Sequence, residues 1–201
     1  MEISATVVKQ LRERTGVGMM ECKSALVEAS GDVTEAEKIL RKRGVAAADK
    51  KAGRATGEGA IASYIHTGGK IGVLLEVNCE TDFAARSEDF RALVHEIAMH
   101  IAAAAPRFVK REDVPDAVLA DEREIAKDQV LKSGKPAAVA DKIVEGKIDK
   151  FLAGICLLEQ PYVKDPEKTV KQVVAERVAK IGENIQVQRF ARFVLGEAPG
   201  A

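Results

Sequence analysis

The sequence predicts an α+β protein, and three observations support this fold class. Amphipathic segments separated by glycine in the first 45 residues predict three short helices. Apolar residues alternate over 71–77, as in a half-buried strand. Across 144–155 they recur at spacings of four, three and four, typical of a helical hairpin or short coiled coil. We therefore expect a three-helix bundle at 1–45, a linker at 46–59, and an α+β core at 60–201 that contains the hairpin at about 118–158.

The bundle should begin with a helix that Ser4 caps and that ends at the turn Thr15-Gly16-Val17-Gly18. A second helix starts near Met19, and Asp32 opens a third, which we expect to end at Gly44. The alanines of the linker offer an alternative, in which the third helix continues through them. The apolar faces that should pack together contain Val7, Val8, Leu11, Met20, Ala25, Leu26, Ala29, Ala36, Ile39 and Leu40.

Two strands and a long helix should follow the linker. The strands, at 60–66 and 70–78, are joined through Thr67-Gly68-Gly69, which is a hairpin signal. Ser87 caps a helix that runs to Pro106 and should cover the apolar face of the hairpin. That face contains Ile71, Val73, Leu75 and Val77.

The last third of the chain predicts three helices and a strand. The two long helices of the hairpin are broken at 133–136, and an amphipathic helix at 168–181 precedes a strand at 184–195 that should complete the sheet. The apolar alternation of this strand slips near Arg189-Phe190, which predicts a bulge. The hairpin seam should contain Val144, Ile148, Phe151 and Ile155, facing Leu119, Ala126 and Val130.

Composition limits the classes of partner. Lys and Arg together number 31, as do Asp and Glu, so net charge gives no general attraction to nucleic acid or to an anionic membrane, and we expect no direct DNA partner. No run of about 18 apolar residues occurs, and the start lacks the features of a signal peptide, which predicts a cytoplasmic protein without membrane association. The three cysteines lack a paired CxxC spacing, so we expect reduced, small apolar residues.

The sequence patterns of common enzyme classes are absent. It contains no glycine-rich phosphate loop, no HExxH and no GxSxG. His95 and His100 lie five residues apart on a predicted helix, whereas a helical metal pair needs a spacing of four. We therefore expect a binding protein that is not an enzyme and has no cofactor or bound metal.

Two short segments stand out as candidate binding surfaces. Phe83 lies after the strand alternation and before the next amphipathic run, so it belongs to neither periodic face. Two explanations remain open for it, contact with a partner and packing in the core. Met19 and Met20 follow a glycine turn, and both cannot point into so small a core. Methionine suits an adaptable partner surface, with core filling as the alternative.

These segments resemble the elongation factor Ts family. Several long motifs occur in collinear order and cover nearly the whole chain. They are LRERTG at 11–16, GMMECK at 18–23, EVNCETDF at 76–83, HEIAMH at 95–100, SGKP at 133–136 and AKIGENI at 179–185.

The resemblance implies a ubiquitin-associated-type three-helix domain, followed by an α+β core with an antiparallel sheet and a protruding coiled coil. It implies a translation elongation factor that binds elongation factor Tu, both GDP-bound and nucleotide-free. Such a guanine-nucleotide exchange factor disturbs the Mg²⁺ and phosphate site, so that GDP leaves and GTP can bind. The short members of the family, with a single core, imply a homodimer formed through the sheet.

The resemblance also implies site residues. Thr81, Asp82 and Phe83 correspond to the family's TDF motif, and Ala84 stands where the family usually has valine. For His66 a partner contact is implied, with a solvent-facing hairpin histidine as the alternative. The residues that correspond to contacts with the partner's GTPase domain are Arg12, Met19, Met20 and Lys23.

Two other functions remain open from the sequence. One is a homo-oligomeric, chaperone-like adaptor that binds helical or unfolded segments and has no exchange activity. The other is RNA or ribosome binding through a local basic cluster, for which a solvated helix end is the alternative. That cluster contains Arg41, Lys42, Arg43, Lys50, Lys51 and Arg54.

Overall fold

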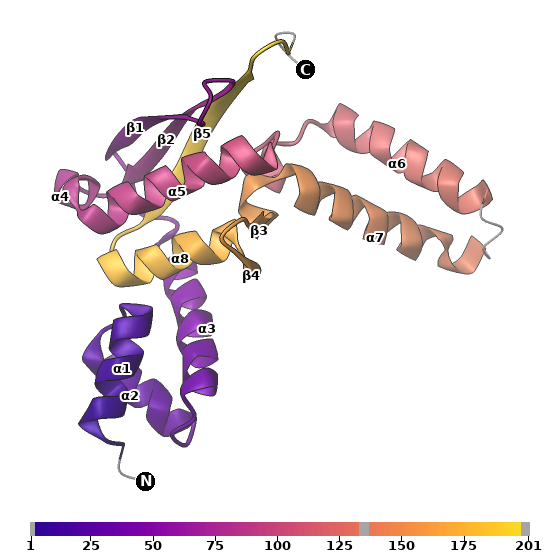
Figure 1. Ribbon diagram of the computed structural model, residues 1–201. Helices are drawn as coiled ribbons and strands as arrows, with labels where there is room; N and C mark the ends of the chain where they lie inside the picture. The colour runs from indigo at the N-terminus through magenta and orange to yellow at the C-terminus, as the bar shows by residue number, and fades with distance from the viewer. Residues whose placement is uncertain (1–2, 133–136, 198–201) are drawn as a thin grey trace. The chain divides into compact units, whose positions relative to one another are not determined.

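A computed structural model describes residues 3–132 and 137–197 of the chain (Figure 1). The helices are α1 (Ala5–Thr15), α2 (Met19–Glu28), α3 (Val33–Lys51), α4 (Asp82–Arg86), α5 (Glu88–Ala104), α6 (Asp116–Lys132), α7 (Ala137–Ile155) and α8 (Val170–Ile181), with 3-10 turns η1 (Arg111–Asp113) and η2 (Leu157–Glu159). The strands are β1 (Glu58–Ile65), β2 (Ile71–Cys79), β3 (Pro161–Tyr162), β4 (Asp165–Thr169) and β5 (Ile185–Val194). This mixture of helices and a small sheet confirms the predicted α+β class.

The chain divides into two compact units that each draw on separate parts of the sequence. Unit 1 contains Met1–Ala62, Leu75–Glu96 and Lys171–Gln188, and unit 2 contains Ser63–Leu74, Ile97–Val170 and Arg189–Ala201. The domain boundaries expected from the sequence stay predictions. None of the helices within the described ranges combines the length and the hydropathy that a bilayer crossing requires.

The N-terminal bundle forms as predicted at its caps. Ser4 Oγ accepts a hydrogen bond from Val7 N at 3.4 Å, and Asp32 Oδ1 accepts one from Glu35 N at 2.9 Å. Gly16 ends α1 in the left-handed conformation, with φ of 69°. The buried core consists of Val8, Leu11, Cys22, Ala25, Leu26, Ala36 and Leu40, with Val7, Ala29 and Ile39 packed against it.

Met20 was predicted to face the core of the bundle, and this prediction is wrong. Its exposure is 76%, whereas Cys22 is fully buried. Positions two apart on a helix lie about 200° around its axis, so only one of the two can face inward. Cys22 takes that place in the apolar core, and its thiol donates to Val17 O at 3.5 Å.

The prediction that Gly44 ends the third helix is also wrong. Helix α3 continues to Lys51, which agrees with the alternative that the third helix extends through the alanines of the linker. Gly44 is buried inside the helix, and an added Cβ would lie 3.7 Å from the Cβ of Ala179. Gly44 therefore lies inside α3 opposite Ala179 of α8, with room for an ordinary Cβ contact, and it does not stop the helix.

The main sheet has the strand order β1-β2-β5. The turn between β1 and β2 is closed by His66 N donating to Ile71 O at 2.9 Å, and β5 reaches β2 at Leu195 N, which donates to Lys70 O at 2.8 Å. In β2 the buried positions alternate, at Val73, Leu75, Val77 and Cys79. Ser87 caps α5 as predicted, because its Oγ accepts from Phe90 N at 3.2 Å.

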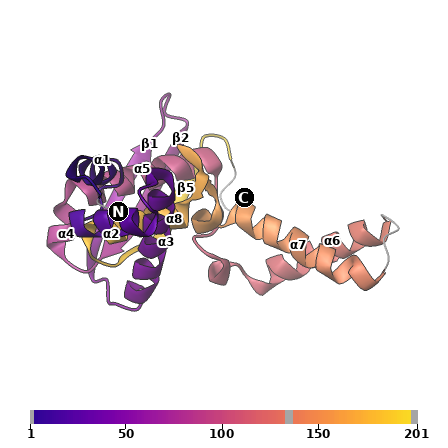
Figure 2. The ribbon, with the colours of Figure 1, turned by 90° about the horizontal axis from the view of Figure 1, so that it is seen from below.

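Helices α6 and α7 lie side by side and form the predicted helical hairpin, which Figures 1 and 2 show from two directions. The break predicted at 133–136 lies outside the described residues. The buried seam contains Ala126, Val130, Val144, Ile148, Leu152 and Cys156, with Leu119, Phe151 and Ile155 packed against it. The small β3–β4 sheet, which follows the hairpin and precedes α8 in the sequence, was not predicted, because Pro161–Thr169 shows little apolar alternation.

Candidate functional site

Residues 81–86 form a short helix at the end of β2. The sequence assigned this segment to neither the strand nor the following helix, and in the structure Asp82–Arg86 is helical as α4 with Thr81 as its N-cap. Thr81 Oγ1 accepts a hydrogen bond from Ala84 N at 3.3 Å, which satisfies one of the free N–H groups of the first turn. The TDF segment is thus a capped helical turn with a defined direction for each side chain.

The capped turn presents Phe83 to solvent. Its exposure is 81%, which is high for an aromatic side chain and excludes the core-packing alternative. Ala84, next in sequence, is 5% exposed and faces inward. Asp82 forms an ion pair with Arg86 one turn later, with 2.9 Å between Oδ2 and Nη2.

Glu183 holds the N-cap of this turn from a distant part of the sequence. Its carboxylate accepts from Thr81 N at 3.0 Å and from Thr81 Oγ1 at 2.7 Å. In the opposite direction, the carboxylate of Glu80 accepts from Asn184 N at 2.6 Å. This hydrogen bond lowers the pKa of Glu80, with a further contribution from Arg54. Each of the two segments therefore provides a carboxylate that accepts a hydrogen bond from a backbone N–H of the other segment.

The other site residues of unit 1 lie at the end of α1 and the start of α2. Arg12, Met19, Met20 and Lys23 are all exposed. The turn between these helices is fixed by Thr15, whose Oγ1 donates to Leu11 O at 2.8 Å and lies 3.8 Å from Cys22 Sγ. In the first turn of α2 it is Cys22 that enters the core, and both methionines stay exposed and accessible to a partner.

His66 belongs to unit 2, whereas the other candidate site residues belong to unit 1. It is exposed at the end of β1, and its Nδ1 is 3.0 Å from the hydroxyl of Tyr64. It is therefore accessible, as the implied contact requires.

Sequence reasoning missed the residues that support the turn. Glu183 and Asn184 occur in a motif that contributed to the resemblance, yet nothing in their local pattern assigned them a role. A signal existed: a charged residue and an amide directly follow a helix-ending Gly182 and precede an apolar strand. Only the fold brings them to Glu80 and Thr81, about one hundred residues earlier.

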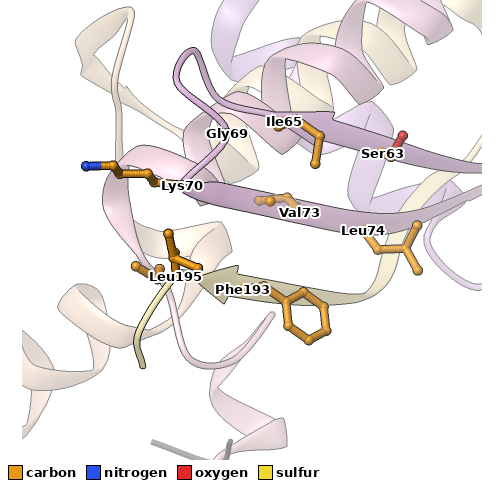
Figure 3. Close-up of a pocket in the computed structure, with 10 residues that line it drawn as sticks. Ser63, Ile65, Gly69, Lys70, Val73, Leu74, Phe193 and Leu195 are labelled. Atoms are coloured by element: carbon orange, nitrogen blue, oxygen red, sulfur yellow. The ribbon is translucent and has the colours of Figure 1, made fainter. Parts of the chain in front are cut away.

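The exposed face of the sheet in unit 2 is apolar. A shallow cavity of about 430 Å³ lies on this face. Figure 3 shows the side chains from β1, β2 and the end of β5 that line it. Among its lining residues, Ile65, Leu74, Phe193 and Leu195 are exposed hydrophobic side chains. Such clusters on a surface commonly mark contacts with other proteins.

These surfaces offer exposed apolar side chains for contact with other proteins. Across the described ranges, no group of three or more His, Cys, Asp and Glu side chains is arranged to hold a metal ion. The cysteines at 22, 79 and 156 are free and buried. The features that remain are an exposed phenylalanine on a capped turn, an exposed methionine pair and an apolar sheet face.

Comparison with known proteins identifies the family. The sequence model described as Elongation factor TS matches residues 5–197. A relative named Elongation factor Ts from Solibacter usitatus is 60% identical over 200 residues, covering 100% of this chain and 94% of the relative. Those from Anaeromyxobacter sp. (strain K) and Caldanaerobacter subterraneus are 62% and 60% identical, covering 98% and 97% of this chain and 90% and 98% of the relatives. With matches of this extent, the chain belongs to the elongation factor Ts family of translation elongation factors.

Proposed function

We propose that the chain is the guanine-nucleotide exchange factor of elongation factor Tu, and that it binds the partner with GDP and without nucleotide. The observation that carries the proposal is the 81% exposure of Phe83 on a turn that is capped and held by hydrogen bonds. An aromatic side chain presented in this way can enter a partner without prior ordering of its own backbone.

The mechanism requires only distortion of the partner's nucleotide site. A GTPase holds GDP through a phosphate-cradling loop and a Mg²⁺ ion with strict octahedral geometry, so small displacements weaken the nucleotide steeply. Phe83 inserts between helices of the GTPase domain, while Asp82 reorganises polar contacts near the Mg²⁺. Because Asp82 is already paired with Arg86, its carboxylate must exchange that partner during binding.

The N-terminal bundle provides the second contact. Met19 and Met20 adapt to the apolar surface of the GTPase domain, and Arg12 and Lys23 add charged contacts. His66 adds a further contact from unit 2. By linkage, the factor by which this chain weakens GDP binding equals the factor by which GDP weakens binding of the chain. GTP then replaces GDP by mass action.

The test is the release of labelled GDP from elongation factor Tu. Phe83→Ala should abolish most of the stimulated release while the free energy of unfolding stays within about 0.5 kcal/mol, since an exposed side chain contributes little to the fold. Ile125→Ala, which removes an exposed aliphatic side chain from α6, is the control and should stimulate release as the unchanged chain does. If Phe83→Ala stimulated release as much as the unchanged chain, the insertion of Phe83 between helices of the GTPase domain would be refuted. Binding without any change in GDP release would favour the adaptor function.

RNA binding has less support than exchange because most of the basic cluster is engaged within unit 1. Arg41 pairs with Glu176 at 3.9 Å, and Arg43 pairs with Glu28. Lys51 donates to Gly182 O at 2.8 Å. Arg54 pairs with the carboxylate of Glu80. Cations that already have partners gain less from phosphate contacts.

We also propose that the chain is a homodimer in the cytoplasm and that the exposed sheet face in Figure 3 is the interface. An apolar face built from three strands can pack on a second copy of itself around a two-fold axis. Phe193→Lys should shift sedimentation toward the monomer, because it places a charge in this face. Leu131→Lys, at an equally exposed position on α6, should leave the sedimentation unchanged. A monomeric unchanged chain would exclude the dimer.

A further inference from the structure

We infer that Glu183 is a positioning residue that holds the turn of residues 81–86, and with it Phe83, in the orientation needed to release GDP. The inference rests on the proposed exchange function. It concerns a residue that does not need to touch the partner, and its effect is transmitted through Thr81.

The contact between Glu183 and Thr81 uses both hydrogen-bond donors of the threonine. The backbone N–H and the hydroxyl proton both reach the same carboxylate, at 3.0 and 2.7 Å. With its proton directed to Glu183, the hydroxyl oxygen has its lone pairs free to accept from Ala84 N. Glu183 therefore fixes the rotamer that makes Thr81 an N-cap.

Glu183 is itself held in place by its neighbours. Asn184 is buried, its backbone N–H bonds to Glu80, and its side chain donates to Arg54 O at 2.9 Å. On the other side, Lys51 donates to the carbonyl of Gly182 at 2.8 Å. The carboxylate consequently works as a fixed support and does not follow movements of the turn.

The turn needs such a support because of its length. Helix α4 has only five residues, far fewer than a helix needs to be stable by itself. Phe83 is exposed and cannot anchor the turn by packing, and only Ala84 is buried within α4. Ser87 Oγ, which donates to Ala84 O at 2.7 Å, holds the end of the turn. The N-cap constrains its start, where Phe83 lies, and Glu183 sets the geometry of the N-cap.

A structural role alone and a positioning role predict different measurements. If Glu183 only stabilised the fold, Glu183→Gln would lower the unfolding midpoint and leave the maximal rate of GDP release unchanged. If Glu183 is a positioning residue, Glu183→Gln should lower the maximal rate of GDP release by about tenfold or more. This factor is typical of losing a hydrogen bond to a charged group. The concentration of chain that gives half-maximal stimulation should change less, because the bundle contacts remain.

The experiment measures three properties of the full chain carrying Glu183→Gln or Glu183→Ala. They are labelled-GDP release from elongation factor Tu at rising chain concentration, the urea midpoint, and amide hydrogen exchange at Thr81 and Ala84 in the free chain. Glu145→Gln, which removes an acid paired with Arg123 on the hairpin, is the matched control and should behave as the unchanged chain. A folded Glu183→Gln with faster amide exchange and a lower maximal rate is the expected result.

Other outcomes overturn the inference in distinguishable ways. Amide exchange that stays slow in both variants would show that Glu183 does not hold the turn. Faster exchange with an unchanged maximal rate would show that the turn's orientation is not needed. If the unchanged chain itself fails to stimulate GDP release, the proposed function fails, and the amide exchange result still decides whether Glu183 holds the turn. Thr81→Val already removes the hydroxyl contact, so adding Glu183→Gln to it should slow GDP release by a smaller factor than Glu183→Gln does in the unchanged chain.

Discussion

Lys180 lies against Gly16 and joins the N-terminal bundle to the start of α5. A Cβ added at Gly16 would lie 3.0 Å from Cε of Lys180, and the Nζ of this lysine is 2.6 Å from Asp89 Oδ1. The aliphatic part of the lysine thus covers the turn that presents Met19 and Met20, while its charge is held by α5. Since Glu183 follows on the same segment, the end of α8 supports both candidate binding surfaces of unit 1.

Replacing Gly16 with alanine should destabilise the chain. Gly16 has a φ of 69°, and a side chain in this region costs about 1 to 2 kcal/mol. Urea unfolding should show a loss of this size for Gly16→Ala. Gly57→Ala is the control, because Gly57 lies outside the left-handed region and has nothing within 4 Å of an added Cβ, so its midpoint should stay nearly unchanged. Equal effects at both positions would contradict the role assigned to the backbone of Gly16.

His100 should make the stability of the chain fall with acidification. It is fully buried, its Nδ1 accepts from Val163 N at 3.3 Å, and its Nε2 lies 3.0 Å from Gln160 Oε1. Burial lowers the pKa of His100 below its ordinary value of about 6.5. Between the two pKa values the unfolded chain binds more protons than the folded chain. The free energy of unfolding therefore decreases as pH falls below about 6.5.

The measurement compares urea unfolding at neutral and mildly acidic pH for the unchanged chain and for His100→Gln. The difference in free energy of unfolding between them should shrink as pH falls, because only the unchanged chain carries the buried imidazole. His95→Gln, on the exposed side of the same helix, should keep the pH dependence of the unchanged chain. A constant difference between the unchanged chain and His100→Gln would contradict a buried neutral imidazole.

Replacing Arg111 by lysine should lower the free energy of unfolding more than the same change at Arg123 of the helical hairpin. Its guanidinium bonds to both oxygens of Glu159 and lies 2.8 Å from Asp149 Oδ1, which connects η1, α7 and η2. Lysine cannot reproduce this fork, so Arg111→Lys should cost about 1 kcal/mol of unfolding free energy. Arg123→Lys replaces a cation with a single 3.6 Å pair to Glu145 and should be neutral. Matching losses in the two variants would show that geometry is unimportant here.

Cys156 should be inert in the folded chain. Burial raises its pKa to about 11, with Glu159 contributing in the same direction, so little reactive thiolate exists near pH 8. Iodoacetamide at that pH should leave the folded chain unmodified, and mass spectrometry after unfolding in guanidinium should find all three cysteines labelled. Rapid labelling of Cys156 without denaturant would indicate local opening of the hairpin base.

Much of the fold could be predicted because its signals are local. The caps Ser4 and Asp32 and the alternating β2 residues were correct, as was the hairpin seam around Val144 and Ile148. The errors, at Met20 and Gly44, arose where a neighbouring element decided the outcome. Cys22 filled the core in place of Met20. The local pattern predicted that α3 ends at Gly44, but the helix continues there, opposite Ala179 of α8.

The candidate site divides in the same way. The sequence by itself singled out candidates for binding, because Phe83 fits no periodic face and Met19 and Met20 cannot both enter a small core. Only the tertiary structure decided what holds them, since Glu183 and Lys180 act through contacts across large separations in sequence. Hydrogen bonds between distant residues leave no periodic trace in a sequence, whereas burial of a helix or strand face does.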